Sequence, residues 1–174
     1  LDVANGQVHY NDVKFGYNAK ESDVLNDIDF EVEPGSKVAL VGESGEGKTT
    51  LTNLLLRFYE PRSGTIEIDG QDISQVTQKS LRRNIAVVFQ AASIFSGTIR
   101  ENIAYARLNS SDEDIEEAAR AANADDFIAK LPKGFDTEIG ERGSKLSGGH
   151  KQRIAIARAV LKDAPILHLD EATS

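Results

Sequence analysis

Residues 38–50 read Val-Ala-Leu-Val-Gly-Glu-Ser-Gly-Glu-Gly-Lys-Thr-Thr, a short apolar run that ends in a glycine-rich turn. The positions of Gly42, Gly47, Lys48 and Thr49 fit the phosphate-binding loop pattern G-x-x-x-x-G-K-[ST]. Glycines let the backbone curl until its N–H groups converge on a phosphate, and the following helix directs its positive end toward the same point. Lys48 adds a cation for the outer phosphates, and Thr49 offers a hydroxyl to Mg²⁺. We therefore expect a buried strand at 38–41, a nucleotide-binding loop and a helix, rather than a turn that matches by chance.

The composition is that of one globular domain of ordinary size, with 174 residues, 40% hydrophobic residues and four prolines. No apolar run approaches the roughly 20 residues needed to span a bilayer, so we expect the chain itself to be soluble. The lack of cysteine excludes disulfides and thiolate metal sites. A net charge of −8 argues against a broadly basic surface, and we expect no nucleic-acid partner. The chain has no methionine and stops at Ser174 directly after Leu-Asp-Glu-Ala-Thr, which indicates a piece of a longer protein.

The first part of the chain alternates in hydrophobicity, which is typical of half-buried strands. The expected strands cover residues 7–17, 24–33 and 65–70, and the inward positions of the first are Val8, Tyr10, Val13 and Phe15. The third strand ends in an Asp-Gly turn. Residues 49–58 have helical spacing, with Leu51, Leu54, Leu55 and Phe58 on one face. These patterns predict an antiparallel β-rich layer around one strand–loop–helix unit.

The second part is mainly helical. Ser111 followed by Asp114 is a capping-box pattern, and a helical insert is expected over about residues 98–131. Ser147 introduces a basic helix that runs to about Lys162. Two further apolar runs predict strands: residues 85–89, which lead to Gln90, and residues 166–169, a buried strand that leads to Asp170 and Glu171.

The acidic residues after the last strand form the second signal for phosphate chemistry. A hydrophobic strand that ends in an acid, downstream of a phosphate loop, places a carboxylate beside Mg²⁺. We expect Asp170 to hold the metal, and Glu171, one residue on, to polarise an attacking water. An Asp-Glu pair considered by itself is usually a solvated strand end, but the phosphate loop favours the functional interpretation.

Leu146-Ser147-Gly148-Gly149-His150 is the third signal. Ser147 is suited to cap the helix that follows, and the glycines expose backbone N–H groups at the positive end of that helix. Such an end suits an anion. On physical grounds alone, an ordinary capped helix explains these residues equally well.

Taken together, these motifs resemble the nucleotide-binding domain of an ATP-binding cassette (ABC) transporter over essentially all 174 residues. Residues 42–49 match the Walker A motif of the family, residues 166–171 match Walker B with its glutamate, and residues 146–150 match the LSGGQ signature. Residues 95–103 and 137–143 resemble the exporter branch, in which they face transmembrane coupling helices and the partner cassette.

The resemblance implies an α/β fold, with a P-loop NTPase (RecA-like) core, an antiparallel β subdomain, an α-helical subdomain, and a core that is incomplete in this chain. The expected division assigns 1–37 and 62–76 to the β subdomain, 38–61, 77–90 and 158–174 to the core, and 91–157 to the helical signature subdomain.

The resemblance also implies roles for individual residues. Tyr17 stands where an aromatic stacks on adenine, and Gln90 stands at the Q-loop glutamine. The expected ATP-binding residues are Tyr17, Gly42, Ser44, Gly45, Gly47, Lys48, Thr49, Thr50, Ser147 and Gly149. The expected Mg²⁺ ligands are Thr49, Gln90 and Asp170, and the expected catalytic residues are Glu171, Lys48 and Gln90. Two cassettes meet head to tail in the family, so Ser147 and Gly149 would contact ATP held by a partner chain.

The sequence departs from the family pattern in several places. His150 replaces the usual signature glutamine, and His168, within the Walker B strand, is expected to be a packed histidine. The D-loop, the next strand and the switch histidine of the family do not occur before Ser174. Without that strand, the two strands that flank it in the family fold would lack a hydrogen-bonding neighbour, so we expect an incomplete sheet.

The leading functional hypothesis is therefore an ATPase at the cytoplasmic face of a membrane, whose Mg²⁺-dependent ATP hydrolysis powers export through partner transmembrane domains. One alternative is a nucleotide-binding fragment with weak or no turnover. The other is a soluble ABC ATPase that acts in DNA repair or translation, which the acidic charge and the exporter-like segments disfavour.

Overall fold

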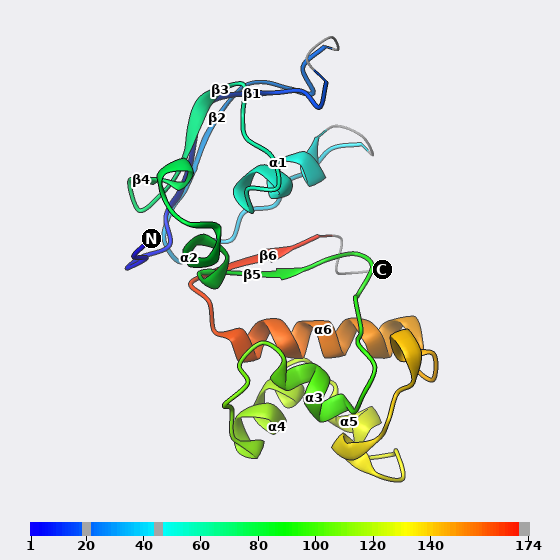
Figure 1. Cartoon of the computed structure of the whole chain (residues 1–174). Coiled ribbons are helices and arrows are strands. Elements are labelled where there is room, and N and C mark those ends of the chain that lie inside the picture. Colours follow the sequence, from blue (N-terminus) through cyan, green and yellow to red (C-terminus); the bar gives the residue numbers. More distant parts are fainter. Residues whose placement is uncertain (19–21, 44–46, 171–174) are drawn as a thin grey trace. The chain divides into compact units, whose positions relative to one another are not determined.

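The structure, a computed structural model, describes residues 1–18, 22–43 and 47–170 (Figure 1). The chain separates into two compact units, Leu1–Ile85 and Ala86–Ser174. No helix in the described ranges is both long enough and apolar enough to cross a bilayer.

The first unit is built on a four-stranded antiparallel sheet in the order β2-β1-β3-β4. Its strands are β1 (Val8–Phe15), β2 (Leu25–Val32), β3 (Ser63–Ile68) and β4 (Gln71–Asp72). The expected inward residues of β1 are all buried, which confirms the alternation read from the sequence. Tyr10 lies opposite both Phe30 and Ile66, and its ring stacks on that of Phe30 at 4.7 Å between centroids.

The predicted Asp-Gly turn joins β3 to β4, and both of its residues have positive φ, 49° at Asp69 and 71° at Gly70. The Asp69 carboxylate accepts hydrogen bonds from four successive backbone N–H groups, those of residues 4–7. These bonds lower the pKa of Asp69. The turn therefore holds the start of the chain against the sheet.

Helix α1 (Lys48–Leu55) follows the phosphate loop as predicted, and Leu51, Leu54 and Leu55 are buried on one face. The expectation for Phe58 is wrong, because the helix ends before it and its side chain is half exposed. Arg57 adopts a φ of 50°, and its guanidinium donates to the carbonyls of Ile73 and Val76. This turn carries Phe58 off the helix face. The short helices η1 (Ile73–Gln75) and α2 (Gln78–Arg83) complete the unit.

The expected buried strand at 38–41 is also wrong. These residues belong to no strand, and Val38, Leu40 and Val41 are exposed, Val41 by 93%. A buried strand needs neighbours for its backbone N–H and C=O groups. Neither sheet of the described residues includes this segment, which agrees with the expectation of an incomplete sheet.

A two-stranded sheet starts at the boundary of the units and pairs β5 (Ile85–Val88) with β6 (Ile166–Leu169). Its strand positions agree with the sequence, but the expected burial of β6 is wrong, since Leu167 and Leu169 are about half exposed. Ala86 and Val88 of β5 pack against Ala155 and Ala159 of α6 (Gly148–Lys162). Along β6, the exposed Leu167 and Leu169 alternate with the partly buried Ile166 and His168.

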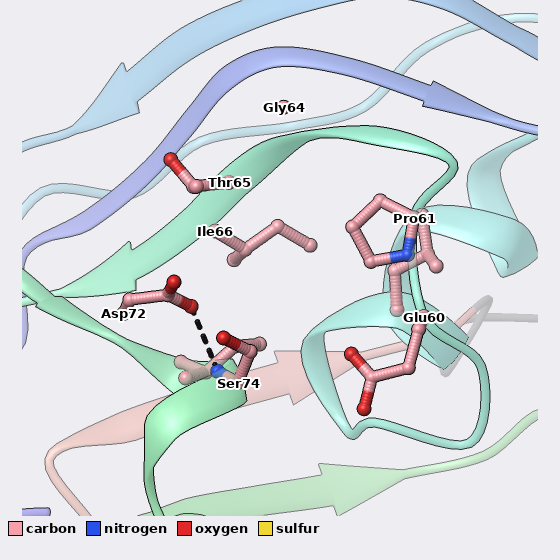
Figure 2. A pocket seen from close by; sticks show the side chains of 9 residues that line it. Glu60, Pro61, Gly64, Thr65, Ile66, Asp72 and Ser74 are labelled. Atoms are coloured by element: carbon pink, nitrogen blue, oxygen red, sulfur yellow. Dashed lines mark hydrogen bonds between the residues drawn. The ribbon is translucent and has the colours of Figure 1, made fainter.

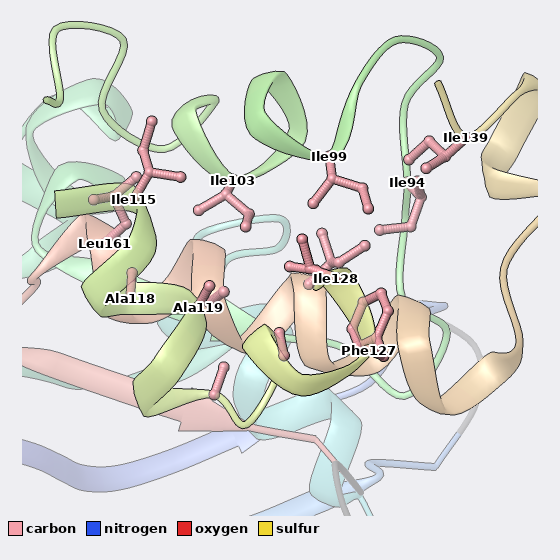
Figure 3. Close-up of a cluster of buried hydrophobic side chains, with 14 residues drawn as sticks. Ile94, Ile99, Ile103, Ile115, Ala118, Ala119, Phe127, Ile128, Ile139 and Leu161 are labelled. Carbon is pink, nitrogen blue, oxygen red and sulfur yellow. The ribbon is translucent and has the colours of Figure 1, made fainter. Parts of the chain in front are cut away.

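The rest of the second unit is a group of helices packed around α6 (Figure 3). These are α3 (Ile99–Ala104), α4 (Asp112–Ala121), α5 (Asp125–Ile128), η2 (Gly134–Asp136) and η3 (Glu141–Gly143). Isoleucines from most of these elements are buried together, among them Ile99, Ile103, Ile115, Ile128 and Ile154. Burying each such side chain contributes about 1.5–3 kcal/mol. The predicted capping box at Ser111 and Asp114 is present, and Thr98 with Glu101 forms a second one.

A buried polar cluster ties α3 to α6. The Asn102 amide accepts from the Phe95 N–H and donates to the carbonyls of Phe95 and Thr98. The Arg158 guanidinium donates to the Asn102 carbonyl and side-chain oxygens and to the Ser93 carbonyl. Residues 93–98 are thereby fixed to the long helix.

Candidate nucleotide-binding site

The phosphate loop turns into α1 at Gly47, which has φ 92° and ψ 3°. A Cβ at this position would lie 2.7 Å from the Leu25 Cδ2 atom, so both the backbone conformation and the available space require glycine. Gly47 therefore places the first N–H groups of α1 directly after the loop.

Lys48 reaches back over the start of the loop. Its Nζ donates to the Gly42 carbonyl at 2.6 Å and to the Glu43 carbonyl at 2.7 Å. This geometry holds a positive charge beside the carbonyls of Gly42 and Glu43. Thr49 is exposed on the first turn of α1. Ser44 and Gly45, two of the expected phosphate contacts, lie outside the described residues.

Tyr17 lies beside the same helix. Its hydroxyl and the Thr50 Oγ1 atom form a hydrogen bond of 3.0 Å, and the Thr50 side chain is buried. The Tyr17 side chain is 46% exposed. The expected adenine-stacking residue is thus joined through its hydroxyl to the third residue of the phosphate-loop helix, and Thr50 supports Tyr17 with its side chain.

The second unit brings Gln90 and Asp170 to one end of the β5–β6 pair. Asp170 follows β6, and its N–H donates to the Val88 carbonyl at 2.9 Å. Gln90 is two residues beyond Val88. The two predicted metal ligands therefore leave neighbouring strands at the same end. Glu171, the expected catalytic residue, lies outside the described residues.

His168 is partly buried within β6. Burial lowers its pKa, while the nearby Asp170 carboxylate acts in the opposite direction. This favours a neutral imidazole near neutral pH, as expected for a packed histidine.

The signature residues lie at the start of α6. Ser147 is the N-cap, and its Oγ accepts from the His150 N–H at 3.2 Å, as predicted. Ser147 and Gly149 are exposed, and a Cβ on Gly149 would meet no atom within 4 Å. The His150 ring stacks on Phe127 with 4.1 Å between centroids. The exposed glycine backbone is thus open to a ligand, while the unusual histidine packs within its own unit.

By residue chemistry alone, the predicted metal ligands are of the types that suit Mg²⁺. Mg²⁺ prefers oxygen ligands and is usually bound by one or two carboxylates together with substrate phosphates and waters. Thr49, Gln90 and Asp170 offer a hydroxyl, an amide oxygen and one carboxylate. Among the described residues, no group of three or more His, Cys, Asp or Glu side chains comes together as an independent metal site.

A separate cavity of about 220 Å³ lies in the first unit between α1, β3 and η1 (Figure 2). Its lining includes Glu60 and Asp72 and none of the phosphate-loop residues that the structure describes. The Asp72 carboxylate accepts from the Ser74 N–H. The Glu60 carboxylate is paired with Arg57 at 2.9 Å, and the cavity offers no cation beyond that pair among its lining residues, so we do not assign the nucleotide to it.

Two aromatic residues next to the predicted site were missed by the sequence reasoning. Tyr59 contacts the Tyr17 ring, and Phe127 contacts His150. Each contact joins residues far apart in the chain, and no local periodicity indicates it. The sequence signal is that Tyr59 is an aromatic residue just after the predicted helix 49–58, and that Phe127 is one within the predicted helical insert.

A family profile described as ABC transporter matches residues 25–174. The chain is 54% identical over 174 residues to the beta-(1-->2)glucan export ATP-binding/permease protein NdvA of Agrobacterium vitis, covering 100% of this chain and 30% of that protein. It is 51% identical to the ATP-dependent lipid A-core flippase of Chromobacterium violaceum, with the same coverage of both chains. The chain therefore spans about 30% of the length of these relatives.

A solved structure described as a bacterial Atm1-family ABC exporter with ATP bound matches with a TM-score of 0.95 and 51% identity. The match covers 99% of this chain and 30% of that one. This similarity shows that the chain has the P-loop NTPase fold of ABC ATPases, including an antiparallel sheet. The chain belongs to the ABC transporter family, as an exporter-type ATP-binding domain.

Proposed function

We propose that this chain binds ATP with Mg²⁺ and, within its transporter, hydrolyses ATP to drive export across a membrane. The observation that carries the proposal is the geometry of the first unit. Lys48 lies against the loop backbone, and Tyr17 is hydrogen-bonded to Thr50 on the helix that the loop opens. These contacts support a phosphate site and a base platform on one helix, and the solved exporter that matches this chain is described as having ATP bound.

The roles that we propose for individual residues are those expected from the sequence motifs. Lys48 and the loop backbone bind the phosphates, and Tyr17 stacks on the adenine ring. Mg²⁺, when bound, neutralises phosphate charge, and Glu171 orients the attacking water. The remaining phosphate contacts are Gly42, Ser44, Gly45, Gly47 and Thr50, and the metal ligands are Thr49, Gln90 and Asp170.

A second cassette completes the proposed site. Ser147 and Gly149 present an exposed helix start with no side chain in front of the Gly149 backbone. Backbone N–H groups at the positive end of a 15-residue helix suit the γ-phosphate of a nucleotide held by the other cassette. We therefore expect a head-to-tail dimer with two shared sites.

The exporter-like segments support a transmembrane partner. An isolated bridge pairs Thr98 with Glu138, and the Ile139 N–H donates to the Gly97 carbonyl at 3.0 Å. Segments 95–103 and 137–143 therefore lie side by side. Phe95, in the first segment, and Tyr105, just after it, are 45% and 60% exposed, with 4.7 Å between their ring centroids. Exposed aromatic pairs suit a protein interface, here with coupling helices at the cytoplasmic face of the membrane.

The isolated 174-residue chain is proposed to bind nucleotide with weak or no turnover. The residues that lead into the phosphate loop, 38–41, are exposed and unpaired with either sheet of the described residues, so the loop lacks support on that side. Titrating Mg-ATP while measuring phosphate release, on this chain and on the full-length protein, tests both statements. Binding by both with turnover only in the full-length protein is expected. A full-length protein that neither binds nor hydrolyses ATP would refute the proposed function.

A further inference from the structure

Three aromatic rings form a cluster around Tyr17, made of Phe15, Tyr17 and Tyr59. The Tyr17 ring meets Phe15 edge-on at 4.9 Å and 83°, and it meets Tyr59 edge-on at 5.1 Å and 89°. The Phe15 and Tyr59 rings are also in contact, at 5.6 Å. Neither neighbour stacks flat on Tyr17, whose side chain is nearly half exposed.

The two neighbours of Tyr17 are anchored to different parts of the first unit. Phe15 is buried at the end of β1. Tyr59 belongs to the turn after α1, in which Arg57 pairs with Glu60 at 2.9 Å and also donates to two backbone carbonyls. Tyr59 therefore connects the C-terminal end of the phosphate-loop helix to the ring that lies near its start.

We propose that Tyr59 is a positioning residue for the nucleotide base. The Tyr59 ring, perpendicular to the Tyr17 ring, restricts it through this contact, while Phe15 and the Thr50 hydroxyl restrict it through theirs. A platform held in one orientation loses less conformational entropy when a base stacks on it, which raises affinity without a direct contact. This inference rests on the proposed function, because it requires Tyr17 to receive the adenine ring.

The test compares two ligands on the full-length protein by calorimetry: Mg-ATP and Mg-tripolyphosphate, which has the phosphates without the base. Tyr59→Leu removes the ring. An aromatic pair of this kind is worth about two- to tenfold in an equilibrium constant. We expect Tyr59→Leu to weaken ATP binding by that factor and to leave tripolyphosphate binding unchanged, because the phosphate loop is untouched.

Two control variants sharpen the test. Tyr59→Phe keeps the ring and should bind ATP like the parent protein. Phe58→Leu changes the adjacent aromatic, whose ring lies under the Arg82 guanidinium at 4.7 Å, and should also have no effect on ATP affinity. If Tyr59→Leu does not fold, Tyr59→Asn replaces it in the test, and it too should weaken ATP binding and leave tripolyphosphate binding unchanged.

Unchanged ATP affinity in Tyr59→Leu would overturn the inference. An equal loss for both ligands would overturn it as well, since that result indicates damage to the phosphate-loop helix rather than to the base platform. These outcomes leave the proposed function intact. A parent protein that binds neither ligand would refute the proposed function, and this inference with it.

Discussion

Replacing Asn102 by alanine removes the centre of the polar cluster that joins α3 to α6. The side chain is 2% exposed and takes part in four hydrogen bonds, with the Phe95 N–H, the Phe95 and Thr98 carbonyls and the Arg158 guanidinium. Each such bond contributes a net 0.5–1.5 kcal/mol, roughly, and groups left unsatisfied add to the loss. Because water reaches some of the freed groups, we expect about 2–4 kcal/mol of destabilisation of the second unit.

Urea unfolding of the chain followed by far-ultraviolet circular dichroism measures this loss, since the second unit holds most of the helix. Arg158→Met and the double variant complete a thermodynamic cycle, and we expect the two changes to be non-additive because the side chains are bonded to each other. Asn102→Asp keeps the acceptor but replaces both donated bonds by a carboxylate oxygen that faces two carbonyls, so it should destabilise at least as much as Asn102→Ala. A change below about 0.5 kcal/mol in Asn102→Ala, the usual range for a surface substitution, would refute this reasoning.

Two further predictions concern the first unit. Gly47→Ala places a Cβ 2.7 Å from Leu25, in a left-handed backbone conformation that costs alanine about 1–2 kcal/mol. We therefore expect calorimetry to show weaker binding of both ATP and tripolyphosphate. The matched control is Gly35→Ala, at a φ of 70° with open space around it, and equal effects of the two substitutions on binding would contradict a role for the loop geometry. Asp69, whose pKa is lowered in the folded chain, contributes stability that is present above its unfolded pKa of about 3.9 and is lost as the pH falls through the lower folded value. Asp69→Ala should therefore destabilise the chain at neutral pH and flatten its unfolding profile below about pH 4, and an unchanged acid profile would count against the four backbone bonds.

Local patterns predicted much of this structure. The alternation of Val8, Tyr10, Val13 and Phe15, the cap at Ser111 and the cap at Ser147 depend on neighbours a few residues away, and each was correct. The turn at Asp69 and Gly70 is of the same kind, since its chemistry resides in the two residues themselves.

Burial that depends on distant strands could not be predicted in the same way. The apolar residues at 38–41 and in β6 indicated buried strands, but their exposure depends on whether neighbouring strands are present. For the same reason the sequence indicated Tyr17 through its resemblance to a family, but not Tyr59, which reaches Tyr17 only after the chain has folded. The sequence therefore predicted which residues belong to the candidate site, but not which side chains support them.

The central claim is that this chain is the ATP-hydrolysing domain of an exporter, and Glu171→Gln in the full-length protein tests it most directly. The substitution keeps the size of the side chain and removes the carboxylate proposed to orient water. The account predicts that Mg-ATP affinity stays within a few-fold of the parent value while phosphate release falls by at least about a hundredfold, the lower end of what a general base contributes. Phosphate release at the parent rate would contradict the assignment of Glu171.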